Sequence, residues 1–475
     1  MMMDFYEMTM SYGYFRQTHG DVRVAFDLFF RSVPDRGGYA VFAGLEHVIE
    51  FVENLSFSDE DIDYFRAQNL FSEEFLSFLR GFRFRGDIYA VPEGTIIYPN
   101  EPLMTIVAPI IDAQLIETAI LAQINHQSLI ATKASRIVRA AEGRKVSDFG
   151  ARRAHNMDAA TYGARAAYIG GVDMTATVSA GQQFGIPISG TMAHSWIMFF
   201  EDEFAAFKKY AELYPQATVL LVDTYDVLHS GIPNAIRTAH EVLAPQGNRL
   251  AGVRIDSGDL AYLSKRVRTM LDDAGLTDCK IILSNSLDEF TISSLLLQGA
   301  QVDSFGVGER LITAKSDPVF GAVYKLVAVE KDGVFAPRIK MSENVEKLTN
   351  PGIKDLYRIY DRHGKAVADM LAIQGEEIDL TKPFRYVDPR KPWKNRFFEG
   401  FSAVNLRRLY VRSGKRVEQL PTLEEIRCYV QKQLAEEIWP EEQRFENPHR
   451  HYLDMTPMYY EVKMGLLDDM RGKHS

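Results

Sequence analysis

One stretch of the sequence reads Val253-Arg254-Ile255-Asp256-Ser257-Gly258-Asp259, a short apolar strand that ends in a carboxylate, with a second carboxylate three residues later. The stretch Leu220–Asp226 repeats this pattern. On both sides of these two stretches, short apolar segments alternate with helical ones. Strand cores are expected at Val146–Phe149, Ile186–Ser189, Val219–Asp223, Gly252–Asp256, Ile281–Ser284 and Val302–Val307. This alternation predicts a parallel sheet with right-handed crossovers.

A polar or small residue stands at the carboxyl end of each expected strand. In chain order these residues are Arg152, His194, Asp223, Asp256, Asn285 and Gly308. In a closed α/β barrel such strand ends form one rim, where active sites lie. A doubly wound open sheet gathers ligands at the same ends. Both architectures therefore predict a site built from these residues.

The composition indicates a globular protein of two or more domains. The chain has 475 residues, 46% of them hydrophobic and 25% charged, whereas single cores stop growing near roughly 250 to 300 residues. The formal net charge of -10 and the lack of a basic patch argue against a nucleic-acid partner. We find no stretch of roughly 18 apolar residues and no basic region followed by an apolar one, so we expect neither a membrane span nor secretion. The two cysteines, Cys279 and Cys428, suit a reducing compartment, and the cytoplasm is the expected location.

The remaining sequence differs in texture from the alternating part. Between residues 12 and 80, apolar side chains at three- and four-residue spacing, such as Phe26, Phe29 and Phe30, predict buried helix faces. Proline-containing turns break residues 86–109 into short strands, and a long helix is expected from about Gln114 to Ala141. The chain is β-rich again after Val329. We therefore expect an N-terminal α+β domain over 1–125, completed by 330–422, an α/β domain over 126–329 and a helical segment over 423–475.

Asp223 and Asp256 have two possible roles. Carboxylates at strand ends accept hydrogen bonds from ribose hydroxyls, or hold a magnesium ion that itself holds a diphosphate. Alternatively, each caps the helix that follows it. The occurrence of two such residues in one chain favours a polyol or metal site.

Three further segments contain residues suited to substrate chemistry. The glycines of Phe305–Arg310 free backbone amides that can hold a phosphate, although a plain tight turn has the same pattern. His194 lies among small residues and is suited to acid, base or nucleophilic chemistry, although most histidines are structural. In Phe149–Arg153 an aromatic ring and two guanidinium groups suit a flat aromatic acid, or else a core phenylalanine beside surface arginines.

Read as strings, these segments resemble the nicotinate phosphoribosyltransferase family over most of the chain. The strings that carry the resemblance are Asp4–Met10, Phe26–Arg31, Phe42–Glu46, Phe149–Arg153, Gly190–Ser195, Val253–Asp259, Phe305–Gly308 and Lys340–Glu343. The resemblance implies the irregular, incomplete α/β barrel of the type II phosphoribosyltransferases, with an α+β sandwich-like domain and a helical C-terminal region. It also implies synthesis of nicotinate mononucleotide from nicotinate and phosphoribosyl diphosphate, with Mg²⁺ and ATP.

The resemblance assigns roles to individual residues. It places the pyridine ring of nicotinate between Tyr6 and Phe149, with Tyr6 donated by the second subunit of a head-to-tail homodimer. Arg254 would bind the nicotinate, with Thr191 beside the ring. His194 matches the histidine that is phosphorylated from ATP.

The other implied contacts are with the phosphorylated sugar. Asp223 and Asp256 would face the ribose and the magnesium-diphosphate, and the backbone of Gly308 and Glu309 would hold the 5-phosphate. Many family members carry a small hydroxyl residue where Glu309 stands, and a carboxylate there repels phosphate unless it points away. The remaining implied substrate-binding residues are Arg152, Asp173 and Asn285.

Three alternative functions remain beside this one. Nicotinamide phosphoribosyltransferase shares the barrel and the histidine, and a single side chain can change the preference between acid and amide. Quinolinate phosphoribosyltransferase is disfavoured, because a second carboxylate needs more cations and the chain is long for that group. A catalytically silent binding protein on the same fold is disfavoured because Tyr6, Arg152, His194, Arg254 and Asp256 are all present.

Overall fold

The structure is a computed structural model that describes residues 2–18, 20–340, 349–379 and 400–470, and only the backbone of 384–387, 395–398 and 471–474. The chain divides into two compact units, one of Ile130–Pro318 and one of Met1–Leu129 with Val319–Ser475. The polar strand ends predicted from the sequence belong to the unit Ile130–Pro318.

The unit Ile130–Pro318 contains a six-stranded parallel sheet in the strand order of a barrel. From one edge to the other the strands are β7 (Met174–Thr175), β6 (Lys145–Asp148), β11 (Ser304–Val307), β10 (Lys280–Ser284), β9 (Gly252–Ile255) and β8 (Val219–Leu221). Along the chain, β6 is the first strand of this sheet and β11 is the last, and these two strands pair in parallel. A doubly wound sheet does not bring its first and last strands together in this way. The sheet is therefore an incomplete α/β barrel, open between β7 and β8.

The opening lies where the sequence predicted a strand over residues 186–189. Only Ile188 is bridged there, in parallel to Thr175, so the expected full strand was wrong. Pro187 has no N–H to donate, and although its carbonyl accepts from Thr175 N at 3.0 Å, the ladder cannot continue through it.

Helices connect the barrel strands. They are α7 (Met157–Ile169), α8 (Val178–Phe184), α9 (His194–Phe199), α10 (Glu203–Leu213), α11 (Ile232–Thr238), α12 (Leu260–Asp273), α13 (Glu289–Leu297) and α14 (Glu309–Ile312). A short 3-10 turn, η2 (Ala151–Arg153), follows β6, and a π-helical turn, η3 (Val227–Gly231), precedes α11. Side-chain caps start four of these helices, α7, α10, α12 and α13; Asp202, for example, accepts from Ala205 N at 2.7 Å.

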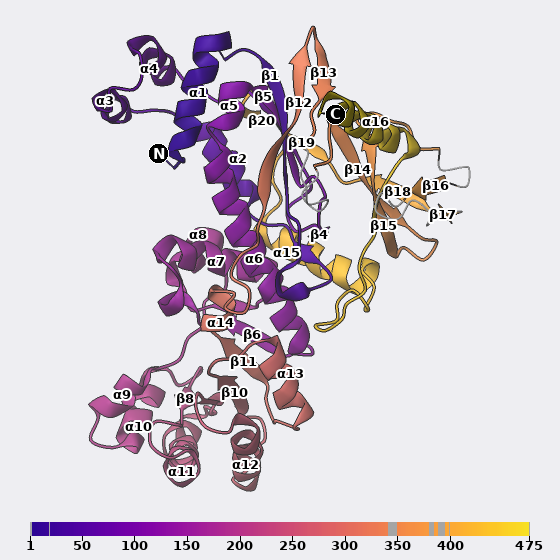
Figure 1. The fold of residues 1–475 in the computed structure, drawn as a ribbon. Helices are drawn as coiled ribbons and strands as arrows, with labels where there is room; N and C mark the ends of the chain where they lie inside the picture. Colours follow the sequence, from indigo (N-terminus) through magenta and orange to yellow (C-terminus); the bar gives the residue numbers. More distant parts are fainter. Residues whose placement is uncertain are drawn as a thin grey trace. The chain divides into compact units, whose positions relative to one another are not determined.

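The other unit is built on two larger sheets. The seven-stranded antiparallel sheet has the order β13 (Val334–Pro337), β12 (Val323–Lys331), β1 (Arg23–Phe29), β5 (Met104–Pro109), β3 (Asp87–Ala90), β19 (Arg408–Arg412) and β20 (Lys415–Arg416). The six-stranded sheet has the order β17 (Asn395–Phe398), β16 (Phe384–Val387), β21 (Leu453–Met455), β15 (Ala366–Ile373), β14 (Lys354–Tyr360) and β18 (Ser402–Asn405). Figure 1 shows β1 beside β12, two strands far apart in the sequence. The region after Val329 thus contributes strands to the same sheet as the N-terminal region.

The helix expected around Phe26, Phe29 and Phe30 was wrong. Phe26 and Phe29 lie on β1, which pairs with β12 on one side and with β5 on the other. Both faces of this central strand are buried, so its apolar residues do not alternate, and their spacing imitates that of a helix.

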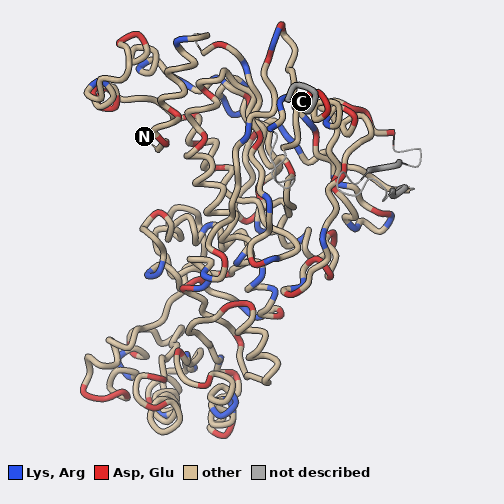
Figure 2. Tube along the Cα trace, viewed as in Figure 1, with Lys and Arg blue, Asp and Glu red and all other residues tan. Residues whose placement is uncertain are grey.

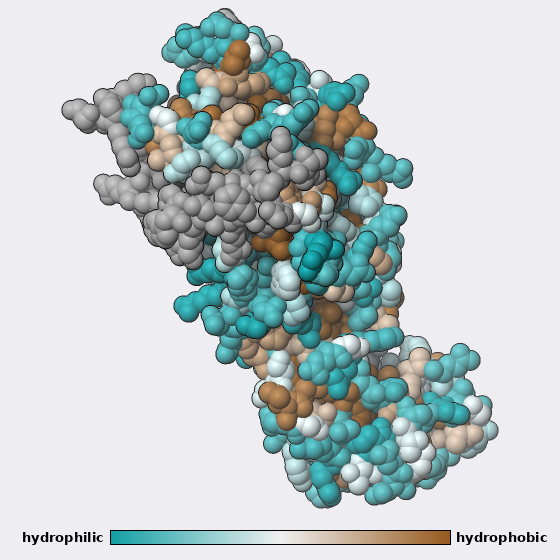
Figure 3. All heavy atoms as spheres, turned by 90° about the vertical axis from the view of Figure 1, so that its right-hand side faces the viewer, coloured by the Kyte–Doolittle hydropathy of each residue, from teal (hydrophilic) through white to brown (hydrophobic). Residues whose placement is uncertain are grey.

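The remaining helices of this unit flank the sheets. They are α1 (Phe5–Thr18), α2 (Leu45–Asn54), α3 (Asp59–Ala67), α4 (Glu73–Arg80), α5 (Ile110–Gln114), α15 (Leu423–Lys432) and α16 (Pro457–His474), and α6 (Glu117–Ala140) runs on into the other unit. The C-terminal region is mainly helical, as predicted, although β21 between its helices joins the six-stranded sheet. No helix in the described part of the chain is long and apolar enough to cross a membrane. Acidic and basic residues are interspersed over both units (Figure 2), and hydrophilic residues dominate the face shown in Figure 3.

Candidate active site

In each predicted pair of carboxylates, the second one, Asp226 or Asp259, caps the helical segment that follows it. Asp226 accepts from Leu228 N and His229 N at 2.9 and 2.8 Å, and Asp259 accepts from Tyr262 N at 3.0 Å. Asp223 and Asp256, one turn earlier, are therefore not needed as caps. This removes the structural alternative for the two carboxylates at the strand ends.

Arg254 and Asp256 are held together by a hydroxyl from the neighbouring strand β10. Arg254 donates from Nε to Ser284 Oγ at 2.8 Å and from Nη2 to Asp256 Oδ1 at 2.9 Å. Ser284 in turn donates to the same oxygen of Asp256. Thr191 Oγ1 accepts from Arg254 Nη1 at 3.1 Å. With its side chain only 12% exposed, the guanidinium is fixed at the carboxyl ends of the strands.

Phe149 lies across β11 and faces this guanidinium. A Cβ atom added to Gly306 would lie 2.5 Å from the Phe149 ring, so only glycine lets the ring occupy that place. The Arg254 guanidinium lies 5.0 Å from the ring centroid, a cation–π distance. A flat aromatic face and a planar cation are thereby brought to one place.

A buried carboxylate supports the turn that carries Phe149 and Arg152. Asp148, the last residue of β6, accepts from Gly150 N and from Thr175 Oγ1, both at 2.8 Å. Burial raises the pKa of this carboxyl. Arg152 follows on η2 and is exposed.

His194 is the first residue of α9 and reaches the ends of both β8 and β9. Its Nδ1 lies 3.1 Å from Thr224 Oγ1, a hydrogen bond. Its Nε2 lies 3.9 Å from Asp256 Oδ2, an ion-pair distance if the ring is protonated. The imidazole is 41% exposed, so a ligand can reach it.

Asp223, at the end of β8, has one bonded and one unbonded oxygen. Oδ2 accepts from Ser257 Oγ at 2.5 Å, and Oδ1 is buried with no hydrogen-bond partner in the described part of the chain. Among the described residues, no three His, Cys, Asp or Glu side chains are grouped closely enough to hold a metal ion.

The last strand, β11, leads into Gly308 and Glu309. Gly308 passes close to the backbone of Phe149: a Cβ atom added to Gly308 would lie 3.1 Å from the Phe149 carbonyl oxygen. The Glu309 carboxylate is engaged by cations: Lys315 Nζ lies 2.6 Å from Oε1 and Arg153 Nε 3.9 Å from Oε2. Lys315, and to a lesser extent Arg153, lowers the pKa of Glu309. Glu309 is thus paired with basic side chains, which offset its charge.

Family models account for nearly the whole chain. Residues 1–125 match the nicotinate phosphoribosyltransferase (NAPRTase) N-terminal domain, 144–349 the NAPRTase family and 353–463 the NAPRTase C-terminal domain. The chain belongs to the nicotinate phosphoribosyltransferase family. The resemblance that the sequence strings indicated is confirmed.

Individual relatives agree with this assignment. A nicotinate phosphoribosyltransferase of Bacillus subtilis is 45% identical over 473 residues, which cover 99% of this chain and 95% of the relative. The crystal structure of human nicotinic acid phosphoribosyltransferase matches with a TM-score of 0.86 and 28% identity, over 98% of this chain and 100% of that one. A nicotinate-nucleotide pyrophosphorylase from Pyrococcus furiosus matches with a TM-score of 0.68 and 26% identity, over 91% and 94%.

Two further residues implied by the family resemblance, Asp173 and Tyr6, have other surroundings. The Asp173 carboxylate accepts from Val146 N at 2.9 Å, at the beginning of β6 and thus at the opposite end of the strands from Arg254. Tyr6 lies on α1 in the other unit and is 43% exposed. Partial burial, with Glu117 and Glu7 nearby, raises its phenol pKa. Residues 341–343 of the Lys340–Glu343 string lie outside the described residues.

The sequence pointed less clearly to Asn285, and not at all to Ser284 or Thr224. Asn285 follows β10 with a left-handed φ of 96°, a conformation common for asparagine at turns. Ser284 and Thr224 are single hydroxyl residues near strand ends, and only the folded structure shows that they contact Arg254 and His194. Each stands next to a residue predicted at the rim, Asn285 or Asp223, and this is the signal that the sequence holds for them.

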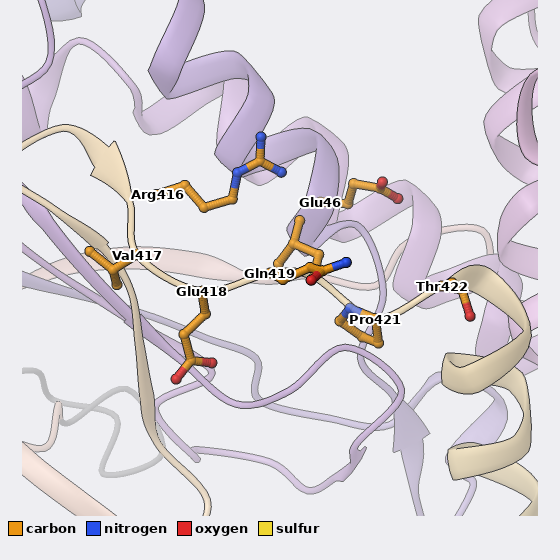
Figure 4. Close-up of a pocket in the computed structure, with 8 residues that line it drawn as sticks. Glu46, Arg416, Val417, Glu418, Gln419, Pro421 and Thr422 are labelled. Carbon is orange, nitrogen blue, oxygen red and sulfur yellow. The ribbon is translucent and has the colours of Figure 1, made fainter.

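A separate surface pocket contains none of these residues. It lies in the other unit, where the strap Arg416–Thr422 passes Glu46 of α2 (Figure 4). Its lining mixes polar and apolar side chains and is mostly exposed, unlike the fixed side chains around Arg254. We therefore place the candidate active site at the carboxyl ends of the barrel strands.

Proposed function

We propose that this chain transfers the phosphoribosyl group of phosphoribosyl diphosphate to nicotinate, forming nicotinate mononucleotide and diphosphate in the salvage route to NAD. The observation that carries the proposal is the Arg254 guanidinium, oriented by three acceptors and facing the Phe149 ring. The transfer takes place in the cytoplasm, and ATP hydrolysis is coupled to the transfer through His194.

Arg254 is suited to a planar carboxylate. Ser284, Thr191 and Asp256 accept from it, so within the described chain three of its five N–H bonds have acceptors and two remain for a ligand. Nicotinate can accept both through its carboxylate while its ring lies on Phe149. Nicotinamide offers a neutral group with one acceptor oxygen, so the geometry favours the acid over the amide.

Asp256 and Asp223 are suited to the ribose and its diphosphate. Displacement at the anomeric carbon has an oxocarbenium-like transition state, which a nearby carboxylate stabilises. The buried Asp223 Oδ1 lacks a partner in the described chain and fits a cation brought in with the diphosphate. Mg²⁺, when bound there, would offset the charge that develops on the leaving diphosphate. Asn285 and the backbone at Gly308 and Glu309 complete the proposed sugar-phosphate contacts.

His194 is suited to carry a phosphoryl group. In the proposed step, a ring nitrogen attacks the γ-phosphorus of ATP, the N–P bond forms, the bond to the bridging oxygen breaks and ADP leaves with that oxygen. Thr224 fixes the ring orientation through Nδ1. The pyridine nitrogen of nicotinate has no proton to lose, so the transfer itself needs no general base.

We further propose a head-to-tail homodimer in which Tyr6 of one subunit covers the nicotinate ring at the other subunit's Phe149. Tyr6 and its neighbour Phe5 are large apolar residues that α1 leaves exposed. Such residues are suited to burial against a second chain.

The test is a product assay with both pyridines. Purified protein with phosphoribosyl diphosphate, ATP and Mg²⁺ should convert nicotinate to its mononucleotide, and nicotinamide at least about 10-fold more slowly. Equal rates with the two substrates would contradict the assignment to nicotinate. Binding of nicotinate without any product would instead support a silent binding protein.

A further inference from the structure

Glu203 is a buried carboxylate near the candidate site to which no role has been assigned. It is the first residue of α10 and is only 3% exposed. Its Oε2 accepts from Ser230 Oγ at 2.5 Å and from Asn234 Nδ2 at 3.3 Å. Ser230 belongs to η3 and Asn234 to α11, so Glu203 joins α10 to the segment that follows β8.

That segment carries two residues of the candidate site. Asp223 and Thr224 stand at its start, and Gly231 stands at its end. A Cβ atom on Gly231 would lie 1.9 Å from the Val222 carbonyl oxygen, so the two ends of the loop 222–231 are in direct contact. Asp226 caps the turn between them. The two ends of the loop thus pack against each other, and Glu203 hydrogen-bonds to the loop through Ser230.

Helix α10 also supports the other half of the His194–Thr224 pair. Trp196, two residues after His194 on α9, donates from Nε1 to the carbonyl of Ala206 on α10 at 3.1 Å. Its ring also packs against Tyr210 of α10, at a centroid distance of 5.9 Å. One helix therefore contacts both the element that bears His194 and the loop that bears Thr224.

We propose that Glu203 is a positioning residue, which holds the loop 222–231 so that Thr224 orients His194 and Asp223 faces the diphosphate. The inference rests on the proposed function and adds a residue to it. A buried carboxylate at the base of the loop is costly unless it is bonded. Ser230 and Asn234 bond to Oε2, whereas Oε1 is buried without a hydrogen-bond partner in the described part of the chain. The Ser230 bond therefore offsets only part of that cost, and it fixes the loop as a consequence. Burial, and the nearby Asp223 and Asp226 charges, raise the pKa of Glu203, in keeping with its closeness to the loop.

The expected effects differ between the two substrates. Asp223 and Thr224 move with the loop, whereas Arg254 and Phe149 are held by β9, β10 and β11. Loosening the loop should therefore weaken phosphoribosyl diphosphate binding and phosphorylation of His194, and leave nicotinate binding intact.

The experiment compares Glu203→Ala, Glu203→Gln and Ser230→Ala in the full-length protein. Glu203→Ala and Ser230→Ala should each raise the KM for phosphoribosyl diphosphate and slow labelling by γ-labelled ATP by roughly 10- to 150-fold, the range for a lost hydrogen bond to a charged group. The KM for nicotinate should change by less than about 2-fold, within the error of independent sites. Glu203→Gln keeps an acceptor for Ser230 and should recover most of both activities. Glu212→Ala, at the exposed far end of α10, is the matched control and should behave as wild type.

The outcomes separate positioning from a merely structural role. If Glu203→Ala and Ser230→Ala lower thermal stability or total activity but leave both KM values and the labelling rate per active site unchanged, the proposal is wrong. It is equally wrong if the KM for nicotinate rises in step with the KM for phosphoribosyl diphosphate. Should Glu203→Ala not fold, Ser230→Ala decides by the same two readouts. Failure of the proposed function itself would appear in the wild-type protein, as absence of product.

Discussion

Arg254 on β9 and Asp256, the residue that follows this strand, stand two residues apart, and their side chains meet in an ion pair of 2.9 Å between Nη2 and Oδ1. Alternate residues of a strand point to the same side, so the Arg-x-Asp spacing alone places the two groups together. The pair joins the proposed nicotinate site to the proposed ribose site. Each partner therefore fixes the other as well as its own substrate.

Replacement of Arg254 by Ala should lower turnover of nicotinate and narrow its advantage over nicotinamide. A carboxylate that loses a charge-assisted hydrogen bond to this guanidinium loses about 1.5 to 3 kcal/mol, or roughly 10- to 150-fold in kcat/KM. Nicotinamide should lose much less. Steady-state kinetics with both pyridines give the two ratios.

Arg249→Ala is the matched control for that substitution. Arg249 lies before β9, is 82% exposed and pairs with Asp278, so its loss should change neither ratio. If Arg254→Ala keeps the wild-type preference, the nicotinate carboxylate binds elsewhere.

Mixing of two inactive chains tests the shared active site. Tyr6→Ala lacks the proposed ring cover and Asp256→Ala lacks the ribose contact, but a mixed dimer holds some sites with both residues intact. Part of the wild-type activity should return after the two chains are unfolded and refolded together. No recovery in heterodimers whose presence has been shown would mean that each subunit builds its own site.

The sequence predicted the barrel strands better than it predicted the outer sheets. Two of the barrel strands appear in the sequence as apolar runs that end in Asp223 or Asp256. Parallel strands that are buried on both faces do not alternate between apolar and polar residues, so such runs are easy to find. The same lack of alternation misled the interpretation of Phe26 and Phe29. Their strand is central in its sheet because it pairs with the distant β12 and with β5, and both of its faces are buried. No local pattern reveals this placement.

Residues that act through tertiary contacts were also beyond the sequence. Ser284 contacts Arg254 because β10 pairs with β9. Glu203 contacts Ser230 because α10 packs beside the loop 222–231. For Asp173 the expected substrate contact stays a prediction. Its carboxylate accepts from the Val146 amide, at the other end of the strands from the cluster around Arg254.

A pH effect on stability is expected from His451, which is fully buried beside β15. Burial alone would lower its pKa, but Asp369, with Nε2 at the ion-pair distance of 3.5 Å, and Glu442, bonded to Nδ1 at 3.1 Å, raise it above the usual value. A raised folded-state pKa means that the stabilisation is complete below the unfolded pKa of about 6.5 and is lost as pH rises through the folded value. Stability from this group therefore decreases above about pH 6.5.

His451→Gln should remove that stabilisation. Breaking a buried ion pair costs about 3 to 5 kcal/mol, so urea unfolding near pH 6 should show a deficit of this order, which shrinks as pH rises. His363→Gln, an exposed histidine of the same unit, should show no such trend. A deficit for His451→Gln that stays constant from pH 6 to pH 9 would indicate lost packing instead of a lost charge.

The proposed role of His194 makes the last prediction, because a phosphoryl carrier and an ordinary base behave differently. A phosphoramidate on the ring is labile in acid and survives base, so incubation with γ-labelled ATP and Mg²⁺ should label the protein in that pattern. His194→Ala should abolish the label. His240→Ala, an exposed histidine of the same unit, should keep it.

The two roles also differ in the activity that remains. With His194→Ala, the groups that position both substrates, Arg254 and Asp256 among them, are still present, so ATP-independent transfer should persist. Loss of a general base would lower turnover by about 10² to 10⁴-fold whether or not ATP is present. The geometry agrees with the carrier, since Thr224 holds one nitrogen of a ring that is otherwise open to a ligand. Label that survives in His194→Ala, or wild-type protein that is active but never labelled, would leave His194 as a residue that only contacts substrate.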